Sequence, residues 1–421
     1  MNVFQTVALL ITLTALFSYV NHRFIRLPET IGVMLIALFI SLGLIGLGFA
    51  GFSGISDSAR NLLARVDFNQ TLMQGLLSFL LFTGALSIDF SELAQHKLDV
   101  SLLASFGVLI STGLIGSAAY GIFRFMGLDV GIGYCFLFGA LISPTDPVAV
   151  LSILKVSGVP KDLEVRIAAE SLFNDGIGVV LFTAIAEIVL GHESFSFARF
   201  GELFLVEAIG GGAFGLGMGW VVYLMMKSID NYLVEVLLSL ALVMGGYALV
   251  SALGMSGPIA IVVAGLVIGN HGRRYAMSDT TRHHLDQFWE LLDGILNAVL
   301  FVLVGLEVLL LPFSKALLLA GLAAIPLALA ARWLSIVVPA IGMRRMALLP
   351  KGSIRIMTWG GLRGGIAVAL ALSIPNGAER NVILAVTYIV VVGSIALQGL
   401  TIQALVLKYF PKSLPNLNLP G

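Results

Sequence analysis

The sequence is poor in charged side chains. Aspartate, glutamate, lysine and arginine make up 11% of its 421 residues, whereas about 25% is usual for soluble globular domains. Hydrophobic residues make up 58%, and the mean hydropathy is +1.00. Such a chain has too little polar surface to face water as a globule, so the composition predicts a membrane protein. The formal net charge is zero, and it gives no indication of nucleic acid or of any acidic partner.

Cysteine is almost missing, and histidine is scarce. The single cysteine, Cys135, cannot form an intrachain disulfide, and we interpret it as a small buried hydrophobic residue. The histidines fall in predicted loops without the spacing of metal ligands: His22, His96, His192, His271, His283 and His284. We therefore expect no resident cofactor and no catalytic residue, and the chain is predicted not to be an enzyme.

The N-terminal segment, residues 1–20, lacks a basic start and a small-x-small cleavage motif, and we interpret it as a membrane helix. A helix needs about 20 apolar residues to cross the hydrocarbon core. Long apolar runs without period-2 alternation disfavour a membrane barrel. The sequence predicts an all-α polytopic membrane protein with about 13 transmembrane helices, at 4–20, 28–49, 71–89, 98–123, 130–154, 164–190, 200–226, 232–252, 257–270, 286–310, 316–342, 354–374 and 381–407.

The distribution of lysine and arginine predicts the orientation. With the N-terminus outside, sixteen of the 24 basic residues fall in cytoplasmic segments and two lie within spans. The six on the outer side are Arg60, Arg65, Arg124, Arg199, Lys315 and Arg380. This bias satisfies the positive-inside rule and supports an odd number of spans, with the C-terminus in the cytoplasm.

Two predicted spans contain residues that break helices. The fifth reads GALISPTDPVAV, with Pro144 and Pro147 on either side of Asp146. The twelfth reads WGGLRGGIAVAL, with four glycines around Arg363. The two spans are seven apart and run in opposite directions. This pattern predicts an inverted repeat of the first six helices (1–6) against the last six (8–13), with broken crossing helices 5 and 12 at a midplane binding site.

The sixth span carries the densest group of polar side chains, in AAESLFNDGIGVVLF. Ser171 and Asp175 are four residues apart and share a helix face, with Glu170 and Asn174 beside them. Moving one charge to the bilayer centre costs roughly 2.5–3.5 kcal/mol on insertion scales. A chain that does so repeatedly is expected to pair or to use those charges.

We expect Glu170 to form a structural ion pair with Arg363, because a buried guanidinium is hard to sustain alone. Asp175 is then left without a cation, and a desolvated carboxylate takes up a proton more readily. Such a group can exchange a proton for a hard cation such as Na⁺ or Li⁺. Asp146, Thr145 and Ser171 are candidates to complete the oxygen shell. A satisfied polar network without a transport role is the alternative.

Other polar features are weaker signals. Arg332 lies within a span, and the sequence names no partner for it. We expect four glutamates near the ends of spans to lie at the membrane interface: Glu187, Glu207, Glu235 and Glu307. The glycines of the seventh span predict close helix packing or a bend; they are Gly210, Gly211, Gly212, Gly215, Gly217 and Gly219.

SPTDPVAV, ESLFNDG and GLRGGIAVAL, in this order, resemble the cation/proton antiporter family, in its branch of NhaP-type antiporters and sodium/proton exchangers. The resemblance covers nearly the whole chain. It implies that Asp175 carries the ion and the proton, that Thr145, Asp146 and Ser171 coordinate Na⁺ with support from Asn174, and that Glu170 pairs with Arg363. Members with Asn-Asp at 174–175 are typically electroneutral.

The resemblance also implies a homodimer in which a core moves against a fixed scaffold. Within one transporter domain, 1–421, we assign 1–90 and 232–311 to the scaffold and dimerisation part. We assign 91–199 and 312–408 to the core and 200–231 to a connecting helix.

The sequence therefore predicts a Na⁺(Li⁺)/H⁺ antiporter of the cell membrane, with a role in pH homeostasis. It works by alternating access, and one carboxylate binds H⁺ or Na⁺ competitively. Membrane lipid is an expected partner; nucleic acid and organic substrates are not. A K⁺/H⁺ antiporter, a Na⁺-coupled symporter and a cation channel are the alternatives.

Overall fold

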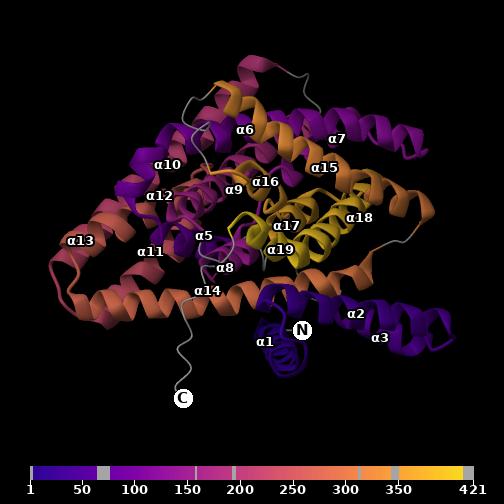
Figure 1. Cartoon of the computed structure of the whole chain (residues 1–421), viewed down its shortest axis with the longest axis horizontal. Helices are drawn as coiled ribbons and strands as arrows, with labels where there is room; N and C mark the ends of the chain where they lie inside the picture. The colour runs from indigo at the N-terminus through magenta and orange to yellow at the C-terminus, as the bar shows by residue number, and fades with distance from the viewer. Residues whose placement is uncertain are drawn as a thin grey trace.

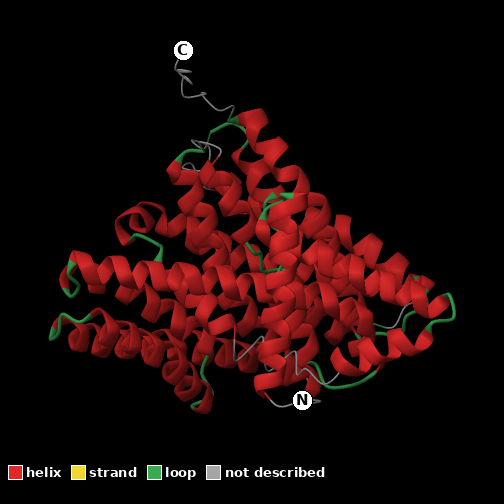
Figure 2. Ribbon diagram, turned by 90° about the horizontal axis from the view of Figure 1, so that it is seen from below, coloured by secondary structure: helices red, strands yellow, loops and turns green. Residues whose placement is uncertain are grey.

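The computed structural model describes residues 3–63, 76–156, 159–191, 196–311, 314–342 and 350–410. Within these ranges the regular structure is helical, and the β-type pairing is one isolated bridge between Asp146 and Leu362. Figure 2 shows helices connected by short loops. The predicted all-α class is confirmed for this part of the chain.

In the described ranges, nine helices are long and apolar enough to cross a membrane, and Leu77–Leu86 and Ile132–Ile142 are shorter apolar helices. The predicted spans at 71–89, 130–154, 257–270 and 354–374 are short or interrupted, so they fall outside these nine. The count of thirteen stays a prediction. Parts of the predictions lie outside the described residues, namely 71–75 of one span and the loop residues Arg65 and His192.

Packing contacts divide the helices into two groups. In the first helix group, α14 packs on α1 and α2, and α12 packs on α5, α10 and α11. In Figure 1, α14 forms the long lower edge and α10 to α13 lie on the left. The members are α1 (Val3–Val20), η1 (Asn21–Ile25), α2 (Glu29–Phe49), α3 (Ser53–Leu63), α5 (Leu77–Leu86), α10 (Phe197–Lys227), α11 (Tyr232–Ala252), α12 (Gly257–Val267), η3 (Ile268–Gly272), α13 (Arg273–Tyr275), α14 (Asp279–Glu307) and η4 (Val308–Leu310).

The second helix group is built around α6, which packs on α7, α9 and α15, while α18 packs on α15 and α17. Its members are α6 (Phe90–Phe125), α7 (Ile132–Ile142), α8 (Val148–Val156), α9 (Lys161–Leu190), α15 (Lys315–Gly342), α16 (Ser353–Trp359), α17 (Gly365–Ser373), α18 (Ala378–Gly393), η6 (Ser394–Gly399) and α19 (Leu400–Tyr409). The two groups touch where α9 meets α5, α10 and α12, where α17 meets α14, and where η6 meets α2.

The glycines of α10 allow it to lie close against α12. A Cβ atom at Gly215 would overlap the backbone of Ala260, and one at Gly211 would lie 2.6 Å from the Ser256 carbonyl oxygen. Small residues that let two helix backbones approach are typical of membrane helix pairs. The predicted close packing is confirmed.

Two of the acidic residues near span ends are covered by the protein itself. Glu235 is fully buried in α11, and Glu307 is 5% exposed at the end of α14. Their position at the depth of the membrane interface stays a prediction. Neighbouring helices bury both side chains, and the position of a residue along its own helix does not predict such burial.

Candidate ion-binding site

Both predicted helix breaks are present, and they meet. The first separates α7 from α8 over residues 143–147, and the second separates α16 from α17 over residues 360–364. The Asp146 N–H donates to the Leu362 carbonyl oxygen at 2.8 Å in an antiparallel bridge. Prolines that lack an N–H interrupt one helix, and glycines interrupt the other. The bridge satisfies backbone groups that the interrupted helices leave free.

Asp146 also caps the helix that follows it. Its Oδ1 accepts from the Val148 N–H, the start of α8, at 3.0 Å. The side chain is half-buried. A Cβ atom at Gly364 would overlap the Asp146 carboxylate, so a glycine in the second break makes room for the acid of the first.

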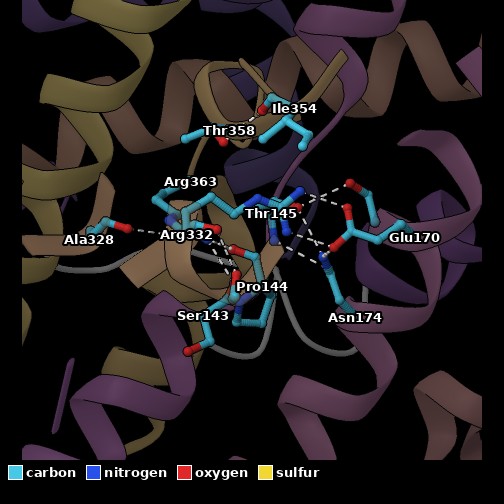
Figure 3. Close-up of polar contacts among 12 residues, drawn as sticks. Ser143, Pro144, Thr145, Glu170, Asn174, Ala328, Arg332, Ile354, Thr358 and Arg363 are labelled. Carbon is cyan, nitrogen blue, oxygen red and sulfur yellow. Dashed lines mark hydrogen bonds and ion pairs between the residues drawn. The ribbon is translucent and has the colours of Figure 1, made fainter. Parts of the chain in front are cut away.

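Asn174 connects α9 to the first break. Its amide nitrogen donates to Thr145 Oγ1 at 2.9 Å and to Glu170 Oε1 at 3.0 Å, while its Oδ1 accepts from the Thr145 N–H at 3.2 Å. The Thr145 and Ser171 hydroxyls lie 3.1 Å apart. Figure 3 shows Thr145 between these α9 side chains and the two arginines. All three side-chain positions on α9, at 170, 171 and 174, are buried.

The direct partner of Glu170 is Arg332, on α15. The two guanidinium nitrogens Nη1 and Nη2 donate to the two Glu170 carboxylate oxygens, each at 2.7 Å. Glu170 is 1% exposed and Arg332 6% exposed, so the pair is withdrawn from solvent. This corrects the predicted Glu170–Arg363 pair and supplies the missing partner of Arg332. A bidentate pair of this kind is the strong form of a charged hydrogen bond.

Arg363 instead binds main-chain oxygens. Its guanidinium donates to the carbonyl oxygens of Ser143 at 2.7 Å, Pro144 at 2.9 Å and Ala328 at 3.4 Å. Its backbone N–H donates to Ser394 Oγ at 3.1 Å. Carbonyls released by the first break are thus satisfied from the second break. With both Glu170 oxygens occupied by Arg332, these carbonyls are the acceptors that Arg363 bonds.

Asp175 lies one residue beyond Asn174 on α9 and is 8% exposed. Among the described residues, no hydrogen bond or ion pair engages its side chain. The charges of Asp146 and Glu170 both act on it. It is the site acid without a fixed partner.

The described residues contain no group of three or more His, Cys, Asp or Glu that would suit a tightly held metal. The oxygen donors gathered here are two carboxylates and two hydroxyls, from Asp175, Asp146, Thr145 and Ser171. Hydroxyl and carboxylate oxygens suit hard cations.

A second buried ion pair was not predicted from the sequence. Arg166 Nη1 lies 2.6 Å from Asp99 Oδ2, and Arg166 Nε lies 3.2 Å from Asp162 Oδ2. Asp99 and Arg166 lie just inside predicted spans that begin at the same membrane face. Opposite charges at equal depth in two spans could have predicted this ion pair.

Comparison with known proteins agrees with this architecture. The family described as "Sodium/hydrogen exchanger, transmembrane" matches residues 10–408. The Na(+)/H(+) antiporter NhaP of Pseudomonas aeruginosa is 52% identical over 408 residues, which cover 96% of each protein. The Na(+)/H(+) antiporter NhaH of Halobacillus dabanensis is 35% identical over 395 residues, 92% of this chain and 93% of NhaH.

Among solved structures, the sodium proton antiporter MjNhaP1 of Methanocaldococcus jannaschii superimposes with a TM-score of 0.74 at 22% identity. The match covers 97% of this chain and 99% of MjNhaP1, and it shows the shared fold. The family match includes both helix breaks and the whole of α9. The chain is a multi-pass membrane protein and belongs to the sodium/hydrogen exchanger family, which consists of transporters rather than enzymes.

Proposed function

We propose that this protein exchanges Na⁺ or Li⁺ for H⁺ across the cell membrane, with Asp175 as the group that binds either ion. The observation that carries the proposal is the state of Asp175, which is 8% exposed and has no hydrogen-bond or ion-pair partner among the described residues. A buried carboxylate in that state needs a proton or a cation. The 52% identity to an Na(+)/H(+) antiporter supports the same conclusion.

Competition at one carboxylate couples the two fluxes. When Na⁺ occupies the site, Asp175 is ionised, and the Asp146, Thr145 and Ser171 oxygens are available to surround the ion. When a proton binds, the carboxyl is neutral and the cation leaves. Because the two ions exclude one another, exchange slows at low pH, where protons win, and at high pH, where the proton to be exported becomes scarce.

The surrounding charges favour one-for-one exchange. Arg332 neutralises Glu170 through two 2.7 Å hydrogen bonds, and position 174 holds a neutral amide rather than a second acid. The site therefore carries the same charge with one H⁺ as with one Na⁺. Asn174 serves as a support that holds Thr145 and Glu170, and Arg363 holds the two breaks together.

Alternating access is proposed to move the two helix groups against each other. The proposed scaffold, 1–90 and 232–311, corresponds to the first helix group, and the proposed core, 91–199 and 312–408, to the second. The proposed connecting helix, 200–231, packs on α12 and so travels with the scaffold. A homodimer through the scaffold, with the N-terminus outside and the C-terminus in the cytoplasm, completes the proposal.

The test is cation-driven proton movement in proteoliposomes that contain a pH-sensitive dye. Wild-type protein should respond to Na⁺ and Li⁺, and a protonophore should not be needed to relieve a membrane potential. Asp175→Asn should abolish the response, because an amide cannot ionise. Asp129→Asn makes the same chemical change at an exposed position and should leave the response unchanged.

Retained exchange in Asp175→Asn would refute the assignment. A response to K⁺ alone would favour the K⁺/H⁺ alternative. Single-channel currents would favour a channel, and counterflow of a labelled organic solute would favour a symporter.

A further inference from the structure

The linker between α5 and α6 is where the chain passes from the first helix group to the second. α5 packs mainly on α12 and α14, with smaller contacts to α11 and to α9, whereas α6 packs on α7, α9 and α15. Only Ser87, Ile88 and Asp89 lie between the two helices. The other two passages, from α9 to α10 and from α14 to α15, include residues outside the described ranges.

The side chain of Asn270, in the π-helical turn η3, binds the linker and the start of α6. Its Oδ1 accepts from the Phe90 N–H at 2.6 Å, and its Nδ2 donates to the Ile88 carbonyl oxygen at 3.0 Å. Nδ2 also donates to Leu266 O at 2.9 Å, one turn earlier. The amide thus pairs with one backbone carbonyl and one backbone N–H where the linker joins α6.

Arg273 extends the same contact to the end of α5. Its Nη1 donates to the Leu86 carbonyl oxygen at 2.7 Å, and its Nη2 forms an ion pair with Asp286 of α14. Leu86 O lies at a helix C-terminus and Phe90 N–H at a helix N-terminus, where backbone groups lack intrahelical partners. Gly269 permits the close approach, because a Cβ there would lie 2.6 Å from Leu86 O.

On the far side of the linker, α6 is attached to α9. Glu92 forms an ion pair with Lys161 at the start of α9, and the buried Asp99 binds Arg166 one turn further along. Helix α9 carries Asp175. A movement of the start of α6 is therefore transmitted to the helix that carries the ion-binding acid.

We propose that Asn270 and Arg273 form the fixed side of a pivot at residues 87–89, about which the second helix group moves during exchange. The inference rests on the alternating-access function proposed above. Asn270 is then a positioning residue: it sets the rate of the movement and leaves the ion-binding oxygens unchanged.

The chain contains a matched control. Asn21, in the π-helical segment η1, holds the α1–α2 turn in the same way, with Nδ2 donating to Leu27 O at 2.9 Å and Oδ1 accepting from Leu27 N at 3.3 Å. Both α1 and α2 pack on α14 within the first helix group. The same substitution at Asn21 therefore removes the same kind of hydrogen bond from a turn whose two helices both belong to the first helix group.

The experiment compares Asn270→Asp with Asn21→Asp in proteoliposomes, where each loses the Nδ2 donor. Asn270→Asp should lower the maximal rate of Na⁺-driven proton movement by about tenfold, while the apparent KM for Na⁺ stays within about twofold. Asn21→Asp should leave both values within about twofold of wild type. A normal rate in Asn270→Asp, a rise in KM that accounts for the loss, or an equal loss in both variants would overturn the proposal.

Deuterium uptake on the same preparations tests the clamp without transport. Asn270→Asp should raise uptake in a peptide spanning 86–93, because the linker loses the hydrogen bond from Nδ2 to the Ile88 carbonyl oxygen that holds it against η3, with little change in 166–180. Unchanged uptake at 86–93 would overturn the clamp. If the wild-type protein moved no protons in response to any cation, the proposed function would be refuted. The deuterium uptake would still test whether Asn270 restrains the linker.

Discussion

At the scale of single residues, the three acids of the site differ in what their carboxylates bind. Glu170 is bound through both oxygens by Arg332. Asp146 accepts a backbone N–H at the start of α8. Asp175 has no such partner among the described residues. Asp175, the acid without a fixed partner, is therefore the group that we propose binds the ion.

Loss of Arg332 should destabilise the fold. Arg332→Ala leaves the Glu170 carboxylate buried without its cation, and breaking a buried pair in this way costs about 3–5 kcal/mol. Arg332→Lys should lie between the alanine variant and wild type, because an ammonium group cannot reproduce the bidentate geometry. Thermal unfolding in detergent, followed by tryptophan fluorescence, measures the difference.

A second change separates charge burial from packing. Glu170→Gln in the Arg332→Ala background should recover part of the lost stability, since no buried charge remains. Arg274→Ala, at an exposed arginine, serves as the control. Arg332→Ala protein as stable as wild type would contradict the importance of the pair.

At the scale of helices, the site depends on two breaks that fit against each other. Gly364 lies against the Asp146 carboxylate, and the Asp146–Leu362 bridge joins the two segments. A methyl group at position 364 has no space unless Asp146 moves. The second break thereby fixes the position of an acid that belongs to the first.

Gly364→Ala should therefore weaken Na⁺ binding. We expect the apparent KM for Na⁺ in vesicles to rise about fivefold or more, because overpacking of this kind typically costs about 1–3 kcal/mol. Gly217→Ala, on α10, where nothing lies within 4 Å of the added Cβ, should have no effect. An unchanged KM in Gly364→Ala would show that Asp146 tolerates displacement.

Asp89 begins α6 as its N-cap, accepting from the Ser91 N–H at 2.7 Å. Hydrogen bonds from the Ser91 side chain and backbone hold the pKa of Asp89 below its usual value of 3.8. The ionised cap is thus present at neutral pH, and its stabilisation is lost as the pH falls below about 4.

Asp89→Ala should lower the stability at pH 7 by about 1 kcal/mol, the usual cost of a lost cap. The difference in melting temperature between Asp89→Ala and wild type should be smaller at pH 3 than at pH 7. The shape of the exchange profile between pH 5 and 9 should not change, because Asp89 does not titrate there. A shifted profile would indicate a proton-linked role for this residue.

At the scale of the whole molecule, the helical class, the two breaks and the grouping of site residues could be predicted from the sequence. Apolar runs identify spans, and proline and glycine at bilayer depth identify breaks. The partner of Glu170 could not be predicted, because two buried arginines compete and the choice depends on how α15 lies against α9. The burial of Glu235 and Glu307 could not be predicted either, because it depends on neighbouring helices and not on the sequence around each glutamate.

The division into two helix groups relates the position of Asp175 to the linker between α5 and α6. Asp175, the proposed ion-binding acid, lies in one group, and the chain reaches that group through a three-residue linker contacted by Asn270 and Arg273 of the other. The proposed oxygen ligands Thr145, Asp146 and Ser171 lie in the same group as Asp175, so a movement between the groups would carry all four together.

The central claim is that one carboxylate binds H⁺ or Na⁺ but never both. It is tested most directly by titrating Na⁺ into purified protein in a calorimeter, in two buffers of different ionisation enthalpy, at a series of pH values. The account predicts that the number of protons released by wild-type protein for each Na⁺ bound rises from near zero at high pH towards one at low pH, and that Asp175→Asn neither binds Na⁺ nor releases a proton. Sodium binding without proton release in the wild-type protein would contradict it.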